Sequence, residues 1–399
     1  MKILVLTNKL PYPPRDGGSI ATLNMMKGLQ LAGNQVTCLA INTLKHNYPV
    51  EEIPSEILET IRILKVDCDC SIRPLMMGSN LLFSKKPYIA ERFNIRAFRN
   101  QLAGLLKMEP FDIIQLEGPY PGQYMDVIRR YSNARVSLRA HNVEHRIWER
   151  KVIFEKSPFK KWYLNNLSKR LKRFEMEMAL QTDFMVPISK LDEAYFRDHG
   201  FHKPSLTIPA GLTMDDYPWS ELPAEPSIFF IGALDWLPNQ EGLAWFIRHV
   251  LDQVVSELPD LKFHVAGRNA PPSFEKKLKH PRITYHGEVG DAVRFMQSFR
   301  VMVAPLLTGS GIRIKILEGL ALGRPVVTTS AGIEGIEARA LQYIRVEDDP
   351  QKFSDQIVRQ IKNMQEPARM ATEARQYISQ NFDNFELSTR LNQFYKSEV

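Results

Sequence analysis

A short segment near residue 310 combines residue types that bind phosphate and hydroxyl groups. Gly309, Ser310 and Gly311 form a turn of small residues, and the apolar pattern that follows predicts a helix with a single acid, Glu318. Free N–H groups and the positive dipole at such a helix start attract an anion. Lys315 precedes Glu318 by three residues and shares its helix face. A carboxylate on an apolar helix needs a partner, and a ribose diol would supply two donors.

This segment, GSGIRIKILEGLALGRPVVTTSAG, resembles the nucleotide-sugar site of glycosyltransferase family 4, whose members are retaining enzymes of the GT-B fold. The resemblance continues through MKILVLTNKLPYPPRDGG, FIGALDWLPN, HVAG, ITYHGEV and VAPLLTGSG. It implies that Gly309, Ser310, Gly311 and Glu318 bind the donor. The chain departs from the family pattern once, because Ser310 stands where a Glu is usual, which leaves Glu318 as the only acid of the pair.

The order of apolar segments predicts α/β architecture. A strand at 3–7, a glycine loop at 11–18, a helix at 20–32 and a strand at 35–41 make one βαβ unit of a parallel sheet. Further strands are predicted at 61–66, 113–116, 136–140, 184–188 and 206–208. A second series has strands at 227–231, 262–266, 283–285, 301–304, 326–328 and 341–346, a helix at 241–258, and helices at 367–381 and 385–396 near the end of the chain.

A Pro-rich segment at 209–226 separates the two series. We therefore predict an acceptor-side Rossmann-like domain at 1–215, a nucleotide-sugar-binding Rossmann-like domain at 216–380, and a C-terminal helix at 381–399. The resemblance implies a GT-B fold, in which two doubly wound domains face each other across a cleft and the last helix crosses back to the first domain.

The loop after the first strand is the first candidate site in the N-terminal domain. Ligands of α/β sheets bind where parallel strands end. The resemblance implies that Gly17 and Gly18 lie beside the donor phosphates, and that Arg15 and Asp16 lie on the acceptor side. Without the resemblance, an ordinary glycine-rich turn is the simpler interpretation.

Two later strand ends carry the other candidates in this domain. His141 follows the strand at 136–140, where a family histidine lies near the reacting carbon, so we assign it a catalytic role by that resemblance. Glu117 follows the strand at 113–116 and is an acceptor-side candidate. The alternatives are a structural histidine and a solvated loop carboxylate.

Cations in the second domain have to stabilise the departing diphosphate. Many family members carry Arg and Lys after the first strand of this domain, where the chain has Trp236 and Asn239. Arg313 and Lys315 are therefore assigned as catalytic cations, with Arg268 as a further donor-binding residue. The resemblance places the base against two more residues, Gly287 and Val289. No Asp-x-Asp motif occurs in this second domain, so we expect neither a metal nor another cofactor.

The composition of the chain indicates its general class and its location. The chain has 399 residues, 44% of them hydrophobic and 24% charged, which is ordinary for a globular protein. No apolar run of about 18 residues occurs. The N-terminus lacks a signal-peptide core, so we expect a cytoplasmic location. Cys38, Cys68 and Cys70 are interpreted as reduced thiols.

Part of the net charge of +7 gathers in residues 146–173, where ten Lys and Arg residues alternate with aromatic and aliphatic ones. This composition suits an anionic membrane surface, on the inner face of the cytoplasmic membrane. A solvated helix whose lysine stems cover apolar surface is the alternative. Nucleic acid is not expected, because no nucleic-acid-binding motif accompanies the charge.

These features predict a retaining, hexosyltransferase-like enzyme. It would move a sugar from a nucleotide diphosphate sugar to a glycan or lipid-linked acceptor, in the synthesis of cell-surface polysaccharide or lipopolysaccharide. Two alternatives stay open: a nucleotide-sugar epimerase of the same fold, and a nucleotide-sugar-binding protein without catalysis.

Overall fold

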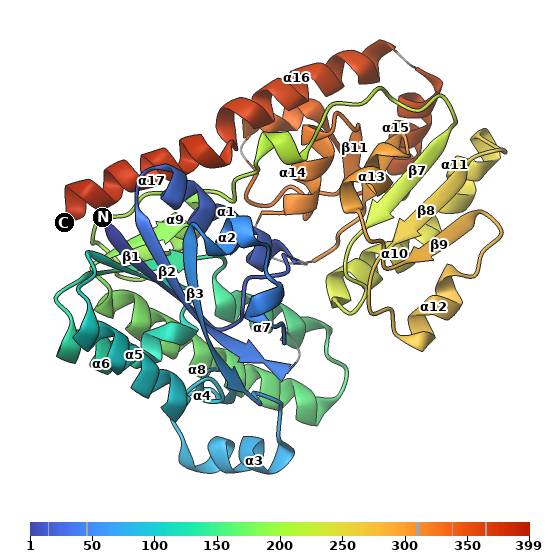
Figure 1. Cartoon of the computed structure of the whole chain (residues 1–399). Helices are drawn as coiled ribbons and strands as arrows, with labels where there is room; N and C mark the ends of the chain where they lie inside the picture. The colour runs from blue at the N-terminus through green and yellow to red at the C-terminus, as the bar shows by residue number, and fades with distance from the viewer. Residues whose placement is uncertain (15, 45–46, 309–311, 337, 364) are drawn as a thin grey trace. The chain divides into compact units, whose positions relative to one another are not determined.

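The computed structural model describes residues 1–14, 16–44, 47–308, 312–336, 338–363 and 365–399. Four of the predicted site residues, Arg15, Gly309, Ser310 and Gly311, lie outside the described residues. The chain forms two compact units, the first from residues 1–211 together with 384–399, and the second from residues 212–383. Figure 1 shows the elements of both units.

The first unit is built on a six-stranded parallel sheet with the order β3-β2-β1-β4-β5-β6. Its strands are β1 (Lys2–Thr7), β2 (Gln35–Thr43), β3 (Ile61–Cys68), β4 (Ile113–Glu117), β5 (Arg135–Ala140) and β6 (Phe184–Pro187). Its helices are α1 (Gly17–Leu31), α2 (Ser55–Leu58), α3 (Pro74–Phe83), α4 (Tyr88–Glu91), α5 (Arg96–Met108), α6 (Met125–Tyr131), α7 (Glu144–Phe154), α8 (Pro158–Gln181), α9 (Lys190–Asp198) and α17 (Asn384–Glu398).

The second unit repeats this strand order in its own sheet, β12-β11-β10-β7-β8-β9. Its strands are β7 (Ser227–Ile231), β8 (Lys262–Ala266), β9 (Ile283–Gly287), β10 (Val301–Ala304), β11 (Val326–Thr328) and β12 (Ile344–Val346). Its helices are α10 (Leu237–His249), α11 (Leu251–Glu257), α12 (Pro272–Leu278), α13 (Ala292–Gln297), α14 (Ile314–Ala321), α15 (Pro350–Lys362) and α16 (Gln365–Asn381). Both sheets have the Rossmann order, so the predicted fold class of two doubly wound α/β domains is confirmed.

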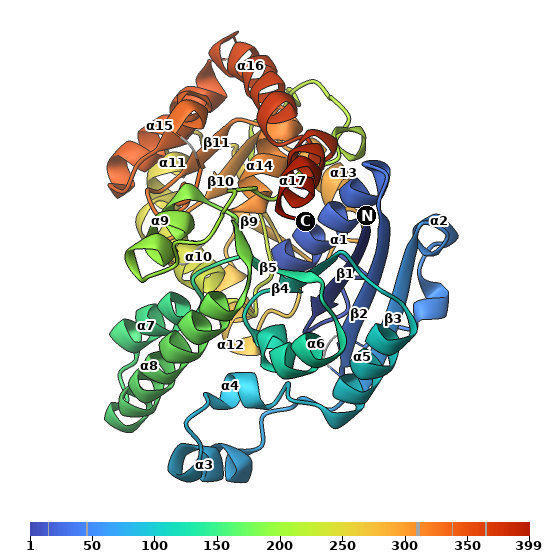
Figure 2. The ribbon, with the colours of Figure 1, turned by 90° about the vertical axis from the view of Figure 1, so that its left-hand side faces the viewer.

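Successive side chains of a strand point to opposite faces of the first sheet, so the sheet has one core on each face. Leu4, Leu6, Ile114 and Leu138 belong to the core that includes residues of α5, α6 and α8. Ile3, Val5 and Ile113 belong to the other core, with apolar residues of α1 and α17. The last helix therefore completes the first unit, as predicted. Figure 2 shows α17 next to α1 in the second view.

Three predicted elements differ from the structure. The predicted strand at 341–346 begins only at Ile344, because Ala338–Tyr343 forms a 3-10 helix. The predicted helix at 241–258 is two helices, α10 and α11, because the backbone at Val250 leaves helical geometry (φ −119°, ψ −43°). Residues 206–208 were expected as a strand but form no named one. They follow an isolated bridge between Met185 and Ser205, and the flanking Pro204 and Pro209 cannot donate backbone hydrogen bonds.

No helix among the described residues has both the length and the apolar composition needed to cross a membrane.

Candidate functional site

Each sheet has a topological switch point, where the strand order reverses and ligands of doubly wound sheets bind. In the second unit it lies between β7 and β10. Gly232 directly follows β7, and a Cβ there would stand 2.8 Å from Asn239 Nδ2 and 3.2 Å from Lys315 Nζ. Glycine at this position leaves room for both side chains beside the strand end.

Lys315, in the first turn of α14, is held by neutral partners. Its Nζ donates to Asn239 Oδ1 over 2.9 Å and stands 4.1 Å from the ring centroid of Phe230. Asn239 is buried and donates in turn to the Ala233 carbonyl over 2.7 Å. Burial, assisted by the charge of Arg313, lowers the pKa of Lys315 to about 7, although the carboxylate of Glu318 opposes the shift. Among the described residues, the hydrogen-bond partner of this lysine is thus an uncharged amide oxygen, and an anionic ligand would supply an opposite charge.

Arg313 occupies the N-cap position of α14 and is buried. Its guanidinium lies 5.8 Å from the ring centroid of Trp236 and 3.9 Å from the Glu334 carboxylate. Arg313 and Lys315 thus stand beside Trp236 and Asn239, the two positions where the family pattern has its own cations. The N-terminal end of α14 therefore supplies positive charge beside the end of β7.

Glu318 has a protein partner that sequence analysis missed. Tyr217, a buried residue near the start of the second unit, donates its hydroxyl to Glu318 Oε1 over 2.9 Å. Arg375 fixes the position of Tyr217 by donating to its carbonyl over 2.5 Å. Burial raises the pKa of Glu318, while the Tyr217 hydrogen bond and the charge of Lys315 work against that rise.

The other predicted donor residues lie at neighbouring strand ends. Arg268 follows β8, and its carbonyl accepts from the Leu234 amide over 2.8 Å. Gly287 ends β9 with a φ of +67°, in the left-handed region that favours glycine. Val289 follows two residues later and is half-buried. Gly287 and Val289 thus lie at the end of β9, the position from which they are assigned to the base.

In the first unit, Glu117 at the end of β4 is the centre of a buried polar cluster. Its Oε2 accepts from His141 Nε2 over 2.5 Å and from Thr22 Oγ1 over 2.9 Å. Gln115 donates to the other carboxylate oxygen. Burial alone would raise the pKa of Glu117, but the charges of His141 and Arg139 and the hydrogen bonds from His141 and Gln115 outweigh it and hold this pKa at about 2. Glu117 is therefore an ionised, buried carboxylate that orients His141, and not a solvated loop residue.

Two further members of this cluster carried no signal in the sequence. Arg139 is 1% exposed, and its Nε lies 3.9 Å from Glu117 Oε2. Tyr395 of α17 donates to Gln115 Oε1 over 2.6 Å and lies 3.2 Å from Ser137 Oγ. A continuous hydrogen-bonded chain therefore runs from Tyr395 through Gln115 and Glu117 to His141.

The loop before α1 has a structural role in the ligand-free protein. Asp16 caps α1 by accepting from the Ser19 amide over 3.0 Å, and its carboxylate pairs with Lys9 Nζ at 2.5 Å. Gly17 and Gly18 form the first turn of the helix, so their amides are at its positive end.

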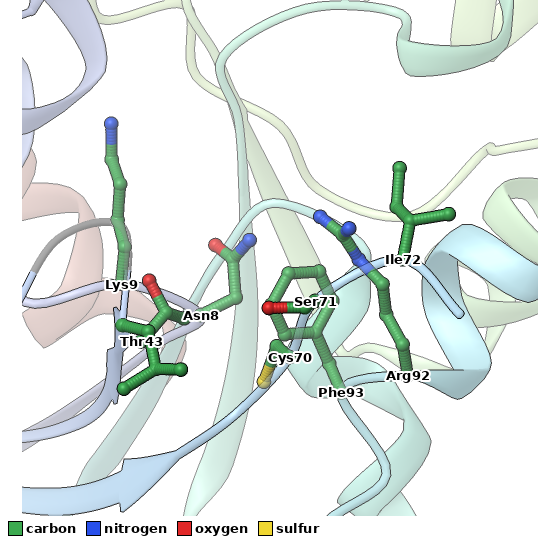
Figure 3. Close-up of a pocket in the computed structure, with 9 residues that line it drawn as sticks. Asn8, Lys9, Thr43, Cys70, Ser71, Ile72, Arg92 and Phe93 are labelled. Carbon is green, nitrogen blue, oxygen red and sulfur yellow. The ribbon is translucent and has the colours of Figure 1, made fainter.

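A pocket opens near the ends of β1, β2 and β3 in the same unit. Its volume is about 520 Å³, within the range of small-molecule sites. Figure 3 shows the lining residues, which are Asn8, Lys9, Thr43, Leu44, Cys70, Ser71, Ile72, Arg92 and Phe93. The pocket combines two cations, Lys9 and Arg92, with polar groups of Asn8 and Ser71. It can accept an anionic or hydroxyl-rich ligand.

The basic segment 146–173 covers α7 and the first part of α8. Several of its cations have partners within the protein: Arg146 lies over the ring of Tyr195, Lys151 lies over Trp148, and Lys172 lies 3.2 Å from His199. The exposed remainder includes Lys156, Lys160, Lys161 and Lys169, with Ile153, Phe159 and Trp162 between 53% and 74% exposed.

Among the residues that the structure describes, no group of three or more His, Cys, Asp or Glu side chains could hold a metal ion.

Comparison with known proteins finds a family model that matches part of the chain, and solved structures with a similar fold. Residues 225–363 match the family model of Glycosyl transferases group 1. An uncharacterised 44.6 kDa protein in the cps region of Klebsiella pneumoniae is 24% identical over 409 residues, covering 96% of this chain and 97% of that protein.

Two solved structures are similar over nearly the whole chain. Alr3699/HepE from Anabaena, in complex with UDP, has a TM-score of 0.69 at 13% identity, with 100% of both chains covered. Sucrose-phosphate synthase from Thermosynechococcus elongatus has a TM-score of 0.72 at 15% identity, covering 100% of this chain and 99% of that one. These similarities confirm the two-domain α/β GT-B fold, and the family match supports a glycosyltransferase.

Proposed function

We propose that this protein is a retaining glycosyltransferase of the family 4 type. It transfers a sugar from a nucleotide diphosphate sugar to a glycan or lipid-linked acceptor. The observation that carries the proposal is the arrangement at the end of β7, where Lys315 and Arg313 stand beside Asn239 and Trp236, and Glu318 presents a carboxylate on the same helix. This arrangement lies in the segment that matches the glycosyltransferase family.

Each group has a chemical part in that reaction. Departure of the diphosphate from the anomeric carbon develops negative charge, which Arg313 and Lys315 would stabilise without a metal. Glu318 would accept hydrogen bonds from the ribose hydroxyls. His141, oriented by Glu117, would lie near the reacting carbon. Gly17 and Gly18 would bind donor phosphate, and Arg15 and Asp16 the acceptor.

The acceptor would occupy the pocket lined by Lys9 and Arg92 in the first unit. A relative encoded in a cps region supports a cytoplasmic role in the synthesis of cell-surface polysaccharide. Exposed Lys156, Lys160 and Lys161, together with Phe159 and Trp162, support contact of the 146–173 segment with an anionic membrane surface.

The test is incubation with a panel of nucleotide sugars and lipid-linked acceptors, followed by NMR of the new glycosidic bond. We expect a product with the anomeric configuration of the donor, and an unchanged rate with a metal chelator present. Inversion of configuration would overturn the retaining mechanism. A new sugar nucleotide formed from donor alone would identify an epimerase, and donor binding without turnover would identify a binding protein.

A further inference from the structure

Helix α3 exposes most of its large apolar side chains to solvent. It contains six large apolar residues, and four of them are exposed: Leu75 at 90%, Met76 at 55%, Leu82 at 76% and Phe83 at 85%. Its buried residue is a polar one, Asn80. A surface helix of a water-soluble domain normally buries its apolar side chains. In α3 this arrangement is inverted.

The protein anchors α3 firmly in this inverted orientation. Asn80 donates to the Lys86 carbonyl over 3.1 Å and also to the Glu91 carboxylate. Arg170 of α8 donates to the carbonyl groups of Asn80, Ser84, Lys85 and Lys86 at the C-terminal end of α3. At the other end, the Arg73 amide donates to the Tyr88 hydroxyl over 3.0 Å. The apolar side chains are therefore held outward by specific bonds.

Cations outnumber carboxylates around α3, where Arg73, Lys85, Lys86 and Arg170 stand against Asp69 and Glu91. Residues 71–90 contain no Asp or Glu but contain Arg73, Lys85 and Lys86, all exposed, although Arg73 pairs with Asp69 at 3.0 Å. The four exposed side chains, Leu75, Met76, Leu82 and Phe83, form an apolar ridge. A ridge flanked by basic residues is complementary to an anionic lipid bilayer, which has negatively charged headgroups over a hydrocarbon interior. A stable protein dimer uses about 20–30 residues on each side, far more than the ridge supplies.

The ridge also leads to the pocket described above. Ile72, two residues before α3, is 64% exposed and lines the pocket, as does Leu44, which is equally exposed. Figures 1 and 2 both show α3 at the periphery of its unit, away from the sheet. A lipid-linked molecule could therefore reach the pocket while its chain stays in the lipid phase.

We propose that α3 inserts Leu75, Met76, Leu82 and Phe83 into the interface of an anionic lipid bilayer. This surface differs from the 146–173 segment, which would contribute charge more than apolar insertion. The proposal does not depend on sugar transfer, because an inserted helix would bind vesicles whatever chemistry the protein performs.

The test uses the full chain and two sets of vesicles, phosphatidylcholine alone and phosphatidylcholine mixed with phosphatidylglycerol. We expect capture by the anionic vesicles that weakens, but persists, at high salt. The triple variant Leu75→Ser, Leu82→Ser, Phe83→Ser should lose at least about 100-fold in partitioning, because each large apolar side chain contributes tenfold or more. The matched control, Leu31→Ser, Met108→Ser, Leu191→Ser, removes apolar side chains that are also exposed and should bind as the wild type does.

A second measurement reports insertion directly. The tryptophan emission that Phe83→Trp adds to that of the wild type should shift to the blue when anionic vesicles are added, whereas the emission that Met108→Trp adds should not. Equal capture of the triple variant and the wild type, or no capture of the wild type, would overturn the proposal. So would a concentration-dependent dimer that the triple variant abolishes, since a second copy would then cover α3. Nucleotide affinity, measured in parallel, should not change in any variant, which separates this outcome from a failure of the proposed function.

Discussion

Individual side chains at the proposed donor site are positioned by uncharged polar and aromatic groups, and Arg313 also lies near the Glu334 carboxylate. Lys315 is bound to an amide oxygen, Glu318 accepts from a phenol, and Arg313 lies over an indole ring. None of these contacts neutralises the charge that it positions. An incoming nucleotide diphosphate sugar can therefore interact with charges that are already oriented, which lowers the cost of binding.

The pair of Glu318 and Tyr217 gives the first prediction. Glu318→Gln should weaken nucleoside diphosphate binding by about 1.5–3 kcal/mol, because an amide accepts less strongly than a carboxylate. Tyr217→Phe should weaken binding less, since it removes a positioning hydrogen bond and no ligand contact. Calorimetry measures both. Glu257→Gln, an exposed carboxylate of the same unit, is the control, and wild-type affinity in Glu318→Gln would remove this residue from the site.

The lowered pKa of Lys315 gives a pH prediction. Its pKa is about 7 in the free protein, against an ordinary value of 10.5, so Lys315 is mostly neutral at pH 8. A bound diphosphate favours the charged form, so binding at pH 8 should take up a proton and weaken as pH rises above 7. Calorimetry in buffers of different ionisation enthalpy measures this uptake, which Lys315→Met should lose and Lys362→Met should retain.

The same shift affects stability with a definite sign. Between pH 7 and 10.5 the unfolded chain binds more protons at Lys315 than the folded chain. The free energy of unfolding contributed by this residue therefore rises with pH across that window. In Lys315→Met this part of the pH dependence should disappear, whereas an unchanged slope would mean that the lysine is charged in the folded protein.

At the scale of elements, α17 is connected to the proposed catalytic histidine. Tyr395 donates to Gln115, Gln115 donates to Glu117, and Glu117 accepts from His141. The last helix of the chain thus takes part in orienting a side chain at the end of β5.

Removing one hydroxyl tests this connection. Tyr395→Phe should cost about 1–3 kcal/mol in the free energy of unfolding, because the buried carbonyl of Gln115 loses its donor. It should also lower kcat without changing nucleotide affinity. Tyr124→Phe removes a comparably buried hydroxyl from the other core, where Tyr124 accepts from the Ile95 amide. It should destabilise the protein without lowering kcat; a normal kcat in Tyr395→Phe would limit Tyr395 to a structural role.

Sequence patterns predicted the strands well because buried parallel strands are continuous apolar runs. They also placed Glu117 and His141 at strand ends. The partners of the site residues could not be predicted, since each is distant in sequence from the residue that it contacts. Tyr217 is 101 residues from Glu318, Asn239 is 76 from Lys315, and Tyr395 is 280 from Gln115. Only the fold determines which of many hydroxyl and amide groups meets each charge.

At the scale of the whole molecule, the second unit is inserted into the first. The chain leaves the first unit after Gly211 and returns at Asn384. The ends of the inserted unit meet, because the Leu212 amide donates to the Phe382 carbonyl over 2.8 Å and Leu212 forms a bridge with Asp383. Each unit has its own sheet and its own core.

This organisation predicts unequal independence of the two units. A fragment of residues 212–383 should fold cooperatively and bind nucleoside diphosphate. A fragment of residues 1–211 should be partly unfolded, because the surface of α1 that packs on α17 is uncovered, and a peptide of residues 384–399 should restore its structure. Circular dichroism and thermal unfolding of the fragments measure this. A stable fragment 1–211 without the peptide would show that α17 is dispensable for folding.

The return of α17 to α1 also imposes an order of events during synthesis. Residues 1–211 leave the ribosome first, yet the helix that covers Leu29 and Met26 is made after the whole inserted unit. At about 5–20 residues per second, this interval lasts on the order of ten to thirty seconds. The second unit can therefore fold while the first unit still lacks α17. The first unit is begun first and completed last.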